Sequence, residues 1–112
     1  MQELKRILEQ MNIPVAYSHF NTSTEPPVIA YYRQSTSNFG ADNKVFYKIN
    51  NYIVELYTEF KCPELETQLE NLFNANNIFY NVTSEDYIDT ENMYQVIYEV
   101  TLENENENIQ SI

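Results

Sequence analysis

The chain of 112 residues contains a single glycine, a single cysteine and no tryptophan. Walker and Rossmann phosphate-binding loops need at least two glycines at fixed spacing, so Gly40 alone excludes nucleotide-binding enzymes of those two families. Cys62 has no second cysteine with which to form an intrachain disulfide, and the Cys/His spacing of a zinc site is absent. These shortages remove the motifs that most readily identify nucleotide-dependent and zinc-dependent proteins.

Basic residues are scarce: six Lys and Arg residues stand against 17 Asp and Glu residues, for a net charge of −11. Nucleic-acid binding and polybasic attachment to a membrane both need clustered basic side chains, so both are disfavoured. The imbalance falls on residues 57–112, where Lys61 is the one basic residue among twelve acidic ones. This acidic half of the chain has three interpretations: charge that keeps the protein soluble, a mimic of DNA, or a surface that faces DNA without binding it. The sequence leaves all three open.

Long apolar runs are also missing. The first residues lack the apolar core of a signal peptide, and no stretch approaches 18 apolar residues, so we expect a soluble protein that is intracellular where it is made. The length predicts one domain, which we place at residues 1–102. Residues 103–112 form an acidic Asn/Glu-rich tail that is predicted to be disordered, because it has almost nothing to bury.

Apolar residues recur at helical spacing in two places. The first stripe lies in residues 2–12 and ends before Pro14, because the residue before a proline avoids the α region. The second begins at Pro63, which suits the first position of a helix, and ends at residues 74–77. The stripe residues are Leu4, Ile7, Leu8 and Met11 in the first helix and Leu65, Leu69, Leu72 and Phe73 in the second.

Polar segments separate the stretches that have the composition of β-strands. Residues 34–43 are predicted to form a long polar loop, and residues 83–92 are predicted to form an acidic loop. The predicted strands are residues 15–20, 28–33, 44–59, 78–82 and 93–102.

The strand segment at residues 44–59 changes its alternation midway. Apolar side chains occupy odd positions up to Ile49 and even positions from Tyr52 onward. A slip of one residue moves every side chain to the other face of a sheet, so Asn50 and Asn51 are predicted to form a bulge or a tight turn. The pattern does not choose between one kinked strand and a short hairpin.

The strands come in adjacent runs, and no parallel βαβ repeat is evident. This order favours the α+β class, with a mostly antiparallel sheet of four to five strands and two helices packed on one face. From Tyr94 to Val100, tyrosine and valine alternate with a mixed set of residues, which predicts one buried face. We expect the other face of the sheet to be rich in tyrosine and to be covered by a neighbouring subunit.

Three features suggest chemistry, and each has a simpler interpretation. A histidine can serve as a general base, but His19 and Ser18 are expected to point to opposite faces of a strand. Cys62 precedes a helix whose positive end favours a thiolate, but two glutamates in the first turn oppose this effect. The acidic loop has neither the glycine nor the spacing of a calcium-binding EF-hand. We interpret His19 as a surface or subunit-contact histidine, Cys62 as a structural residue and the acidic loop as a solvated surface.

Several segments nevertheless resemble a known family. Residues 13–17 (IPVAY) and 26–31 (PPVIAY) are followed by residues 39–47 (FGADNKVFY) and 51–57 (NYIVELY). The helix that begins at Pro63 and the stretch YQVIYE at residues 94–99 complete the series. In this order they resemble the tail terminator (tail-completion) proteins of long-tailed bacteriophages and prophages. The motifs are strand and turn signatures and none is catalytic, so the order of the segments carries the resemblance.

The resemblance implies a structural protein that is not an enzyme and uses no cofactor or metal. Its copies would assemble into a ring, usually a hexamer, that caps the tail tube and stops its polymerisation. The implied partners are further copies of the chain, the major tail tube protein and a head-completion (connector) protein, while DNA passes through without specific binding. The implied locations are the host cytoplasm during assembly and then the tail of the virion.

This hypothesis gives roles to the two predicted loops. The polar loop is expected to meet the tube or the next subunit, because long loops tend to carry contacts. The acidic loop is expected to line the lumen of the ring and to repel passing DNA. The candidate residues are Gln34, Ser37, Asn38, Phe39, Asp42, Asn43 and Lys44 for contacts, and Glu85, Asp86, Asp89 and Glu91 for the lumen. The alternative function is a small acidic DNA mimic or anti-defence inhibitor.

Overall fold

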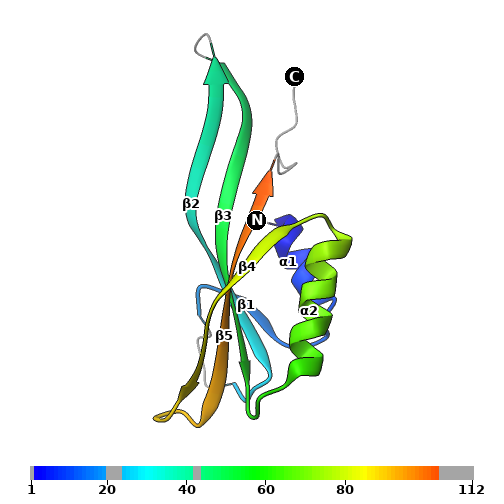
Figure 1. Cartoon of the computed structure of the whole chain (residues 1–112), viewed down its shortest axis with the longest axis vertical. Helices are drawn as coiled ribbons and strands as arrows, with labels where there is room; N and C mark the ends of the chain where they lie inside the picture. The colour runs from blue at the N-terminus through cyan, green and yellow to red at the C-terminus, as the bar shows by residue number, and fades with distance from the viewer. Residues whose placement is uncertain (1, 20–23, 42–43, 104–112) are drawn as a thin grey trace.

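The computed structural model describes residues 2–19, 24–41 and 44–103, and describes side chains for residues 3–19, 24–34 and 49–103 (Figure 1). Residues 104–112, which are most of the predicted tail, lie outside the described residues, and Glu103 ends the last strand. The elements are α1 (Gln2–Glu9), β1 (Val15–Tyr17), β2 (Val28–Ala41), β3 (Lys44–Thr58), α2 (Pro63–Ala75), β4 (Phe79–Ile88) and β5 (Met93–Glu103).

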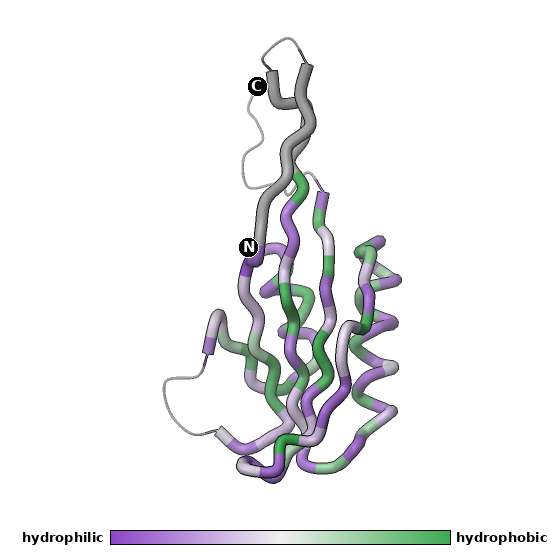
Figure 2. Tube along the Cα trace, turned by 60° about the vertical axis from the view of Figure 1, so that its left-hand side comes forward, coloured by the Kyte–Doolittle hydropathy of each residue, from purple (hydrophilic) through white to green (hydrophobic). Residues whose placement is uncertain are grey.

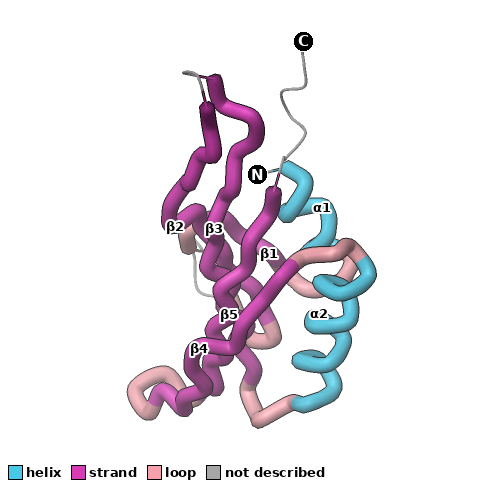
Figure 3. The backbone as a smooth tube through the Cα atoms, turned by 45° about the horizontal axis from the view of Figure 1, so that its top comes forward, coloured by secondary structure: helices cyan, strands magenta, loops and turns pink. Residues whose placement is uncertain are grey.

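The five strands form one sheet in the order β1-β2-β3-β5-β4. The short strand β1 runs parallel to β2, and all other neighbours are antiparallel. Both helices lie on the same side of this sheet, as Figures 1 and 3 show. The prediction of an α+β fold with a mostly antiparallel sheet is therefore confirmed.

Both predicted helices form where their apolar stripes lie. In α1 the stripe residues Leu4, Leu8 and Met11 are buried, although the helix ends at Glu9 and a hydrogen-bonded turn carries the chain on to Asn12. In α2 Pro63 takes a position in the first turn. Green and purple segments alternate along both helices in Figure 2, as expected for helices with one covered side. Neither helix in the described part of the chain is long and apolar enough to cross a membrane.

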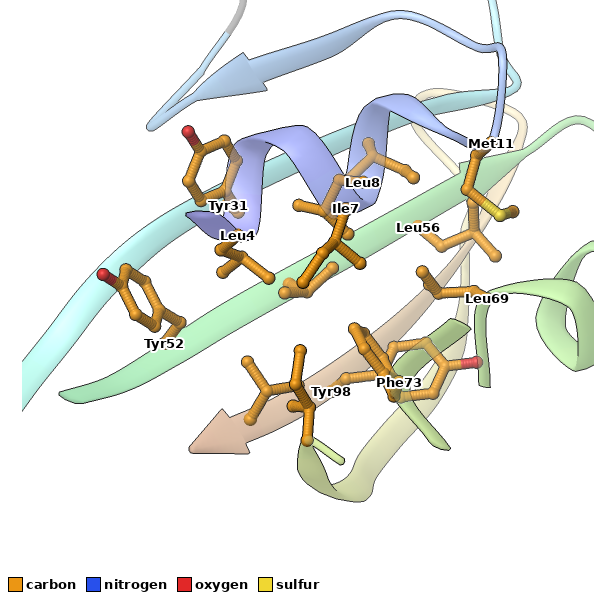
Figure 4. Packing of buried hydrophobic residues seen from close by; sticks show 14 of the residues in the cluster. Leu4, Ile7, Leu8, Met11, Tyr31, Tyr52, Leu56, Leu69, Phe73 and Tyr98 are labelled. Atoms are coloured by element: carbon orange, nitrogen blue, oxygen red, sulfur yellow. The ribbon is translucent and has the colours of Figure 1, made fainter. Parts of the chain in front are cut away.

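The core lies between the helices and the sheet (Figure 4). Leu69 and Phe73 of α2 are completely buried, and the ring of Phe73 meets the ring of Tyr98 edge to face at a centroid distance of 5.7 Å. The hydroxyl of Tyr98 donates a hydrogen bond of 2.9 Å to Glu70 Oε2 on the same helix. A tyrosine can therefore be buried here, because its polar end reaches a partner at the margin of the core.

The tyrosines contradict one expectation about the sheet. Most of them lie on the helix-covered face: Tyr31, Tyr52 and Tyr98 are buried, and Tyr80 packs against the same cluster. The uncovered face was predicted to be rich in tyrosine, and this prediction is wrong. The layer between the two helices and the sheet has to be filled by side chains, and large aromatic rings fill it better than small side chains.

Residues 34–41 were predicted as part of a loop, and this prediction is also wrong. They continue β2 and pair with β3 in a hairpin that extends beyond the rest of the sheet (Figure 1). The pairing of β3 with β5 begins at Ile49, so residues 44–48 pair with β2 alone. A two-stranded ribbon has no face that must enter a core, so polar composition does not separate such a strand from a loop.

The irregularity predicted at Asn50 and Asn51 lies on the neighbouring strand. Arg33 pairs with Tyr52 and Ser35 pairs with Asn51, so Gln34 is the extra residue, while β3 pairs with β5 without interruption. Asn50 is fully buried and accepts a hydrogen bond of 3.4 Å from Arg33 Nη1. The bulge or turn at Asn50 and Asn51 is therefore not observed, and the alternation changes where β3 leaves its β5 neighbour.

The acidic segment at residues 83–92 is only partly a loop, which corrects the second loop prediction. Strand β4 continues to Ile88, and Glu85 and Asp86 pair with Val96 and Gln95 of β5. Thr83 is skipped in this pairing and donates a hydrogen bond to the carbonyl oxygen of Ile97. At an edge of the sheet, an acidic side chain can point to water from within a strand, so charge alone does not end the strand.

Replacing Leu69 with alanine tests the helix-covered core. Leu69 is fully buried on α2, so we expect the variant to lose about 2–5 kcal/mol of unfolding free energy in urea titrations. Asn71→Ala on the exposed side of the same helix is the control and should change stability by less than about 0.5 kcal/mol. Equal losses in the two variants would contradict this core.

The buried hydroxyl of Tyr98 predicts a loss of stability in alkali. Burial, and then the Glu70 carboxylate, raise the pKa of Tyr98 well above its usual value of 10.0. The folded state thus holds this proton more tightly, so its contribution is complete below pH 10 and falls as the pH rises further. Tyr98→Phe should cost about 1 kcal/mol at neutral pH and should show a smaller loss between pH 8 and pH 11. Urea titrations at both pH values measure this, and equal alkaline losses would refute it.

Candidate functional site

One face of the sheet carries no described helix. Side chains alternate between the two faces along each strand. The residues that lie between core residues in β2, β3, β4 and β5 therefore point to this face. We call it the open face and define it by Val28, Ala30, Tyr32, Ile53, Glu55, Tyr57, Phe79, Asp86, Gln95, Ile97 and Glu99.

The open face combines apolar and charged side chains. Phe79 is 66% exposed and Tyr32 is 36% exposed, whereas Ile53 in the central strand β3 is buried. Glu99 lies directly beside Ile53 in the register. Apolar side chains within a polar surround are typical of protein contact surfaces.

A hollow of about 300 Å³ lies at one end of the open face. Val28, Ala30 and Met93 give it an apolar floor, and Glu55 and Glu91 bring carboxylates to it. Its lining residues Ile88, Glu91 and Met93 belong to the β4–β5 turn and the strand ends beside it. This turn lies at the end of the molecule opposite the far ends of β2 and β3 where they leave the sheet (Figure 1). We call it the end hollow.

A hydrogen-bonded set of side chains fixes the polar part of the end hollow. Tyr57 donates a hydrogen bond of 2.9 Å to Glu55 Oε1, and Gln95 Nε2 donates one of 2.9 Å to the Tyr57 hydroxyl. Burial first, and then the Glu55 carboxylate, raise the pKa of Tyr57 to about 12. Tyr57 is therefore protonated at neutral pH and holds Glu55 in place, and it is poorly suited to act as a general base.

His19 also lines the end hollow, together with Ser18. The two residues follow β1, and Ser18 has a positive φ of 74°, so the expected strand geometry with side chains on opposite faces is not present. Ser18 Oγ lies 3.2 Å from His19 Nδ1. In a serine hydrolase the hydroxyl contacts Nε2 while a carboxylate holds Nδ1, so this contact does not reproduce a catalytic triad.

Cys62 lies directly before α2 and makes no side-chain cap to the helix. Its Sγ donates to Glu64 Oε1 across 3.7 Å, and the side chain is partly buried. The geometry therefore supports the interpretation of Cys62 as a structural residue.

The four acidic candidates for a lumen do not share one face of the chain. Glu85 lies on the helix side of β4 and forms an ion pair of 2.8 Å with Lys61, which also contacts Glu66. Asp86, the next residue, lies on the open face beside Gln95. Asp89 and Glu91 are exposed in the β4–β5 turn. No three His, Cys, Asp or Glu residues in the described ranges are grouped to hold a metal ion.

The contact residues predicted on the polar loop lie on the hairpin instead. Gln34, the bulge residue, is exposed, and the backbone of Ser37, Asn38, Phe39 and Lys44 belongs to the paired strands β2 and β3. Asp42 and Asn43 lie outside the described residues. The sequence analysis expected an uncovered face of the sheet but not its residues, and it missed the end hollow. The alternation of Ile53, Glu55 and Tyr57 was the signal for the open face.

The chain matches no known protein-family model. A search among curated proteins also finds no match. A function for this protein therefore has to be argued from the sequence segments quoted above and from the geometry of the open face, the end hollow and the hairpin.

Proposed function

We propose that the protein is a structural component of phage tail assembly that acts as a tail terminator. Its copies form a ring on the end of the tail tube, stop the polymerisation of the major tail tube protein and provide the surface for head attachment. The order of the sequence segments supports this proposal, and so does a fold whose most prominent feature is surface available for contact. In this role the chain is not an enzyme and enters the virion with the tail.

The open face is the observation that carries the proposal. It leaves Phe79 and Tyr32 in contact with water in the isolated chain. Covering an exposed phenylalanine contributes about 25 cal/mol for each Å² of apolar area removed from water. A contact between two different surfaces of identical copies closes into a ring when the rotation between copies allows it.

The edges of the sheet offer a second means of contact. β1 covers β2 only from Ile29 to Tyr31, so the outer edge of β2 has no described strand neighbour in the hairpin. β4 forms the other edge of the sheet. Strand edges with unpaired backbone groups can bind further strands, and a ring subunit can use them to join a neighbour.

The charge of the chain suits a ring through which DNA passes. Asp86, Asp89 and Glu91 are exposed and have no cation within ion-pair distance among the described side chains. We propose that Asp86 and Asp89 face the lumen, where like charge keeps DNA from binding. Glu85 contributes less, because Lys61 neutralises it.

The alternative, a DNA mimic, is less well supported by this geometry. A mimic needs carboxylates arrayed along one face at the spacing of phosphates. The described carboxylates are instead spread over α1, α2, both faces of β4 and the β4–β5 turn. This distribution favours an assembly protein over a phosphate-like surface.

Assembly of tail tubes in vitro tests the proposal. The major tail tube protein of the same genome is polymerised with and without this protein, and tube lengths are measured by electron microscopy. We expect the mean tube length to fall as the ratio of this protein to tube protein rises, with density at one end of each tube. An unchanged length distribution would contradict the proposal.

Two variants make the experiment specific for the open face. Phe79→Asp places a charge on that face and should weaken termination about tenfold or more, because a contact would have to bury an unpaired carboxylate. Phe60→Asp is the matched control, because Phe60 is 72% exposed in the bend between β3 and α2 and should terminate tubes like the natural chain.

A further inference from the structure

The two ends of the molecule differ in the sign of their charge. The hairpin arm, whose paired strands are residues 38–41 and 44–48, carries Lys44 and Lys48. Asp42 is the one acidic residue in the sequence between positions 38 and 48, although the whole chain has a net charge of −11. The end hollow, with Glu55 and Glu91, lies at the opposite end of an axis of 52 Å. Opposite charges at opposite ends favour head-to-tail contact between copies.

The acidic end is broader than the end hollow itself. A second depression of about 430 Å³ adjoins it, because Thr24 and Glu91 line both. This depression adds Glu25 and Glu59, and none of the described lysines and arginines lines either of the two. An apolar floor with carboxylates at its margin fits an aliphatic side chain that ends in a positive charge, because the stem covers apolar atoms while the head meets the carboxylates.

The hairpin arm has the reach that such a contact needs. Residues 44–48 pair with β2 alone, so the arm extends past the end of β5 by about 16 Å, at about 3.3 Å for each residue. It ends far from its own end hollow, at the other end of the molecule (Figure 1). A lysine of the arm can therefore meet such a hollow only on another copy.

We propose that the hairpin arm of one copy docks in the end hollow of the next copy, with Lys44 or Lys48 facing Glu91 and Glu59. The proposal rests on the ring assembly proposed above and names the surfaces that join its subunits. Each docked copy presents a further arm and a further hollow, so association continues until the ring closes. The occupant is a second copy, because this chain itself supplies the complementary charge.

Charge reversal at each end tests the contact. In one variant, Lys44→Glu and Lys48→Glu reverse the arm, and in another, Glu59→Lys and Glu91→Lys reverse the hollow. Sedimentation velocity over a series of concentrations at low salt measures association. We expect each variant alone to associate at least about tenfold more weakly than the natural chain, because like charges then meet. A mixture of the two variants should recover association, because every arm again meets a hollow of opposite charge.

Two controls carry the same changes of charge elsewhere. Lys5→Glu with Arg6→Glu, on the exposed side of α1, matches the arm variant, and Glu9→Lys with Glu103→Lys matches the hollow variant. Both controls should associate like the natural chain. Urea titrations of all variants establish that folding is intact, which is expected because the described side chains that are replaced are exposed.

Each outcome of this experiment decides the proposal. Recovery in the mixture, together with loss of association at high salt, supports docking. A natural chain that sediments as a monomer at every concentration, or a mixture that does not recover, overturns it. If docking fails but the protein still shortens tail tubes, the tail terminator proposal stands without this contact. If the mixture recovers association but the tubes are not shortened, the terminator proposal is refuted and the docking contact stands.

Discussion

The packing of α1 and α2 against one face of the sheet is the constraint on which the rest of the structure depends. Leu8 and Phe73, both fully buried in one core cluster, hold the two helices over the same face of the sheet. Because side chains alternate along a strand, the burial of Tyr52 commits its neighbour Ile53 to the other face. The open face, the end hollow and the exposure of Phe79 all follow from this one-sided cover.

The hairpin arm lies past the part of the sheet that the helices cover. From Lys48 to Lys44, β3 pairs with β2 and no longer pairs with β5. The arm carries the basic residues Lys44 and Lys48 within an acidic chain. The fold separates the two signs of charge along its long axis, and this separation favours contact between the ends of different copies.

The sequence predicts what burial determines and misses what it does not. The stripes that contain Leu8 and Leu69 identify both helices, because a helix on a core needs apolar residues at that spacing. Residues 34–41 of the hairpin and the acidic part of β4 were mistaken for loops, because strands outside the core or at an edge tolerate polar residues. The end hollow joins Ser18, Glu55 and Glu91, which are far apart in the chain, so no local pattern reveals it.

The central claim is that the open face is covered when the protein meets its assembly partners. Carbodiimide labelling of carboxylates, read by mass spectrometry, tests it most directly on the free chain and on chain bound to tail tubes. Glu99 lies on the open face, and Glu64 lies in the first turn of α2. The account predicts that Glu99 loses most of its labelling in the bound state while Glu64 keeps its own. Equal labelling of each carboxylate in the free and bound states would contradict it.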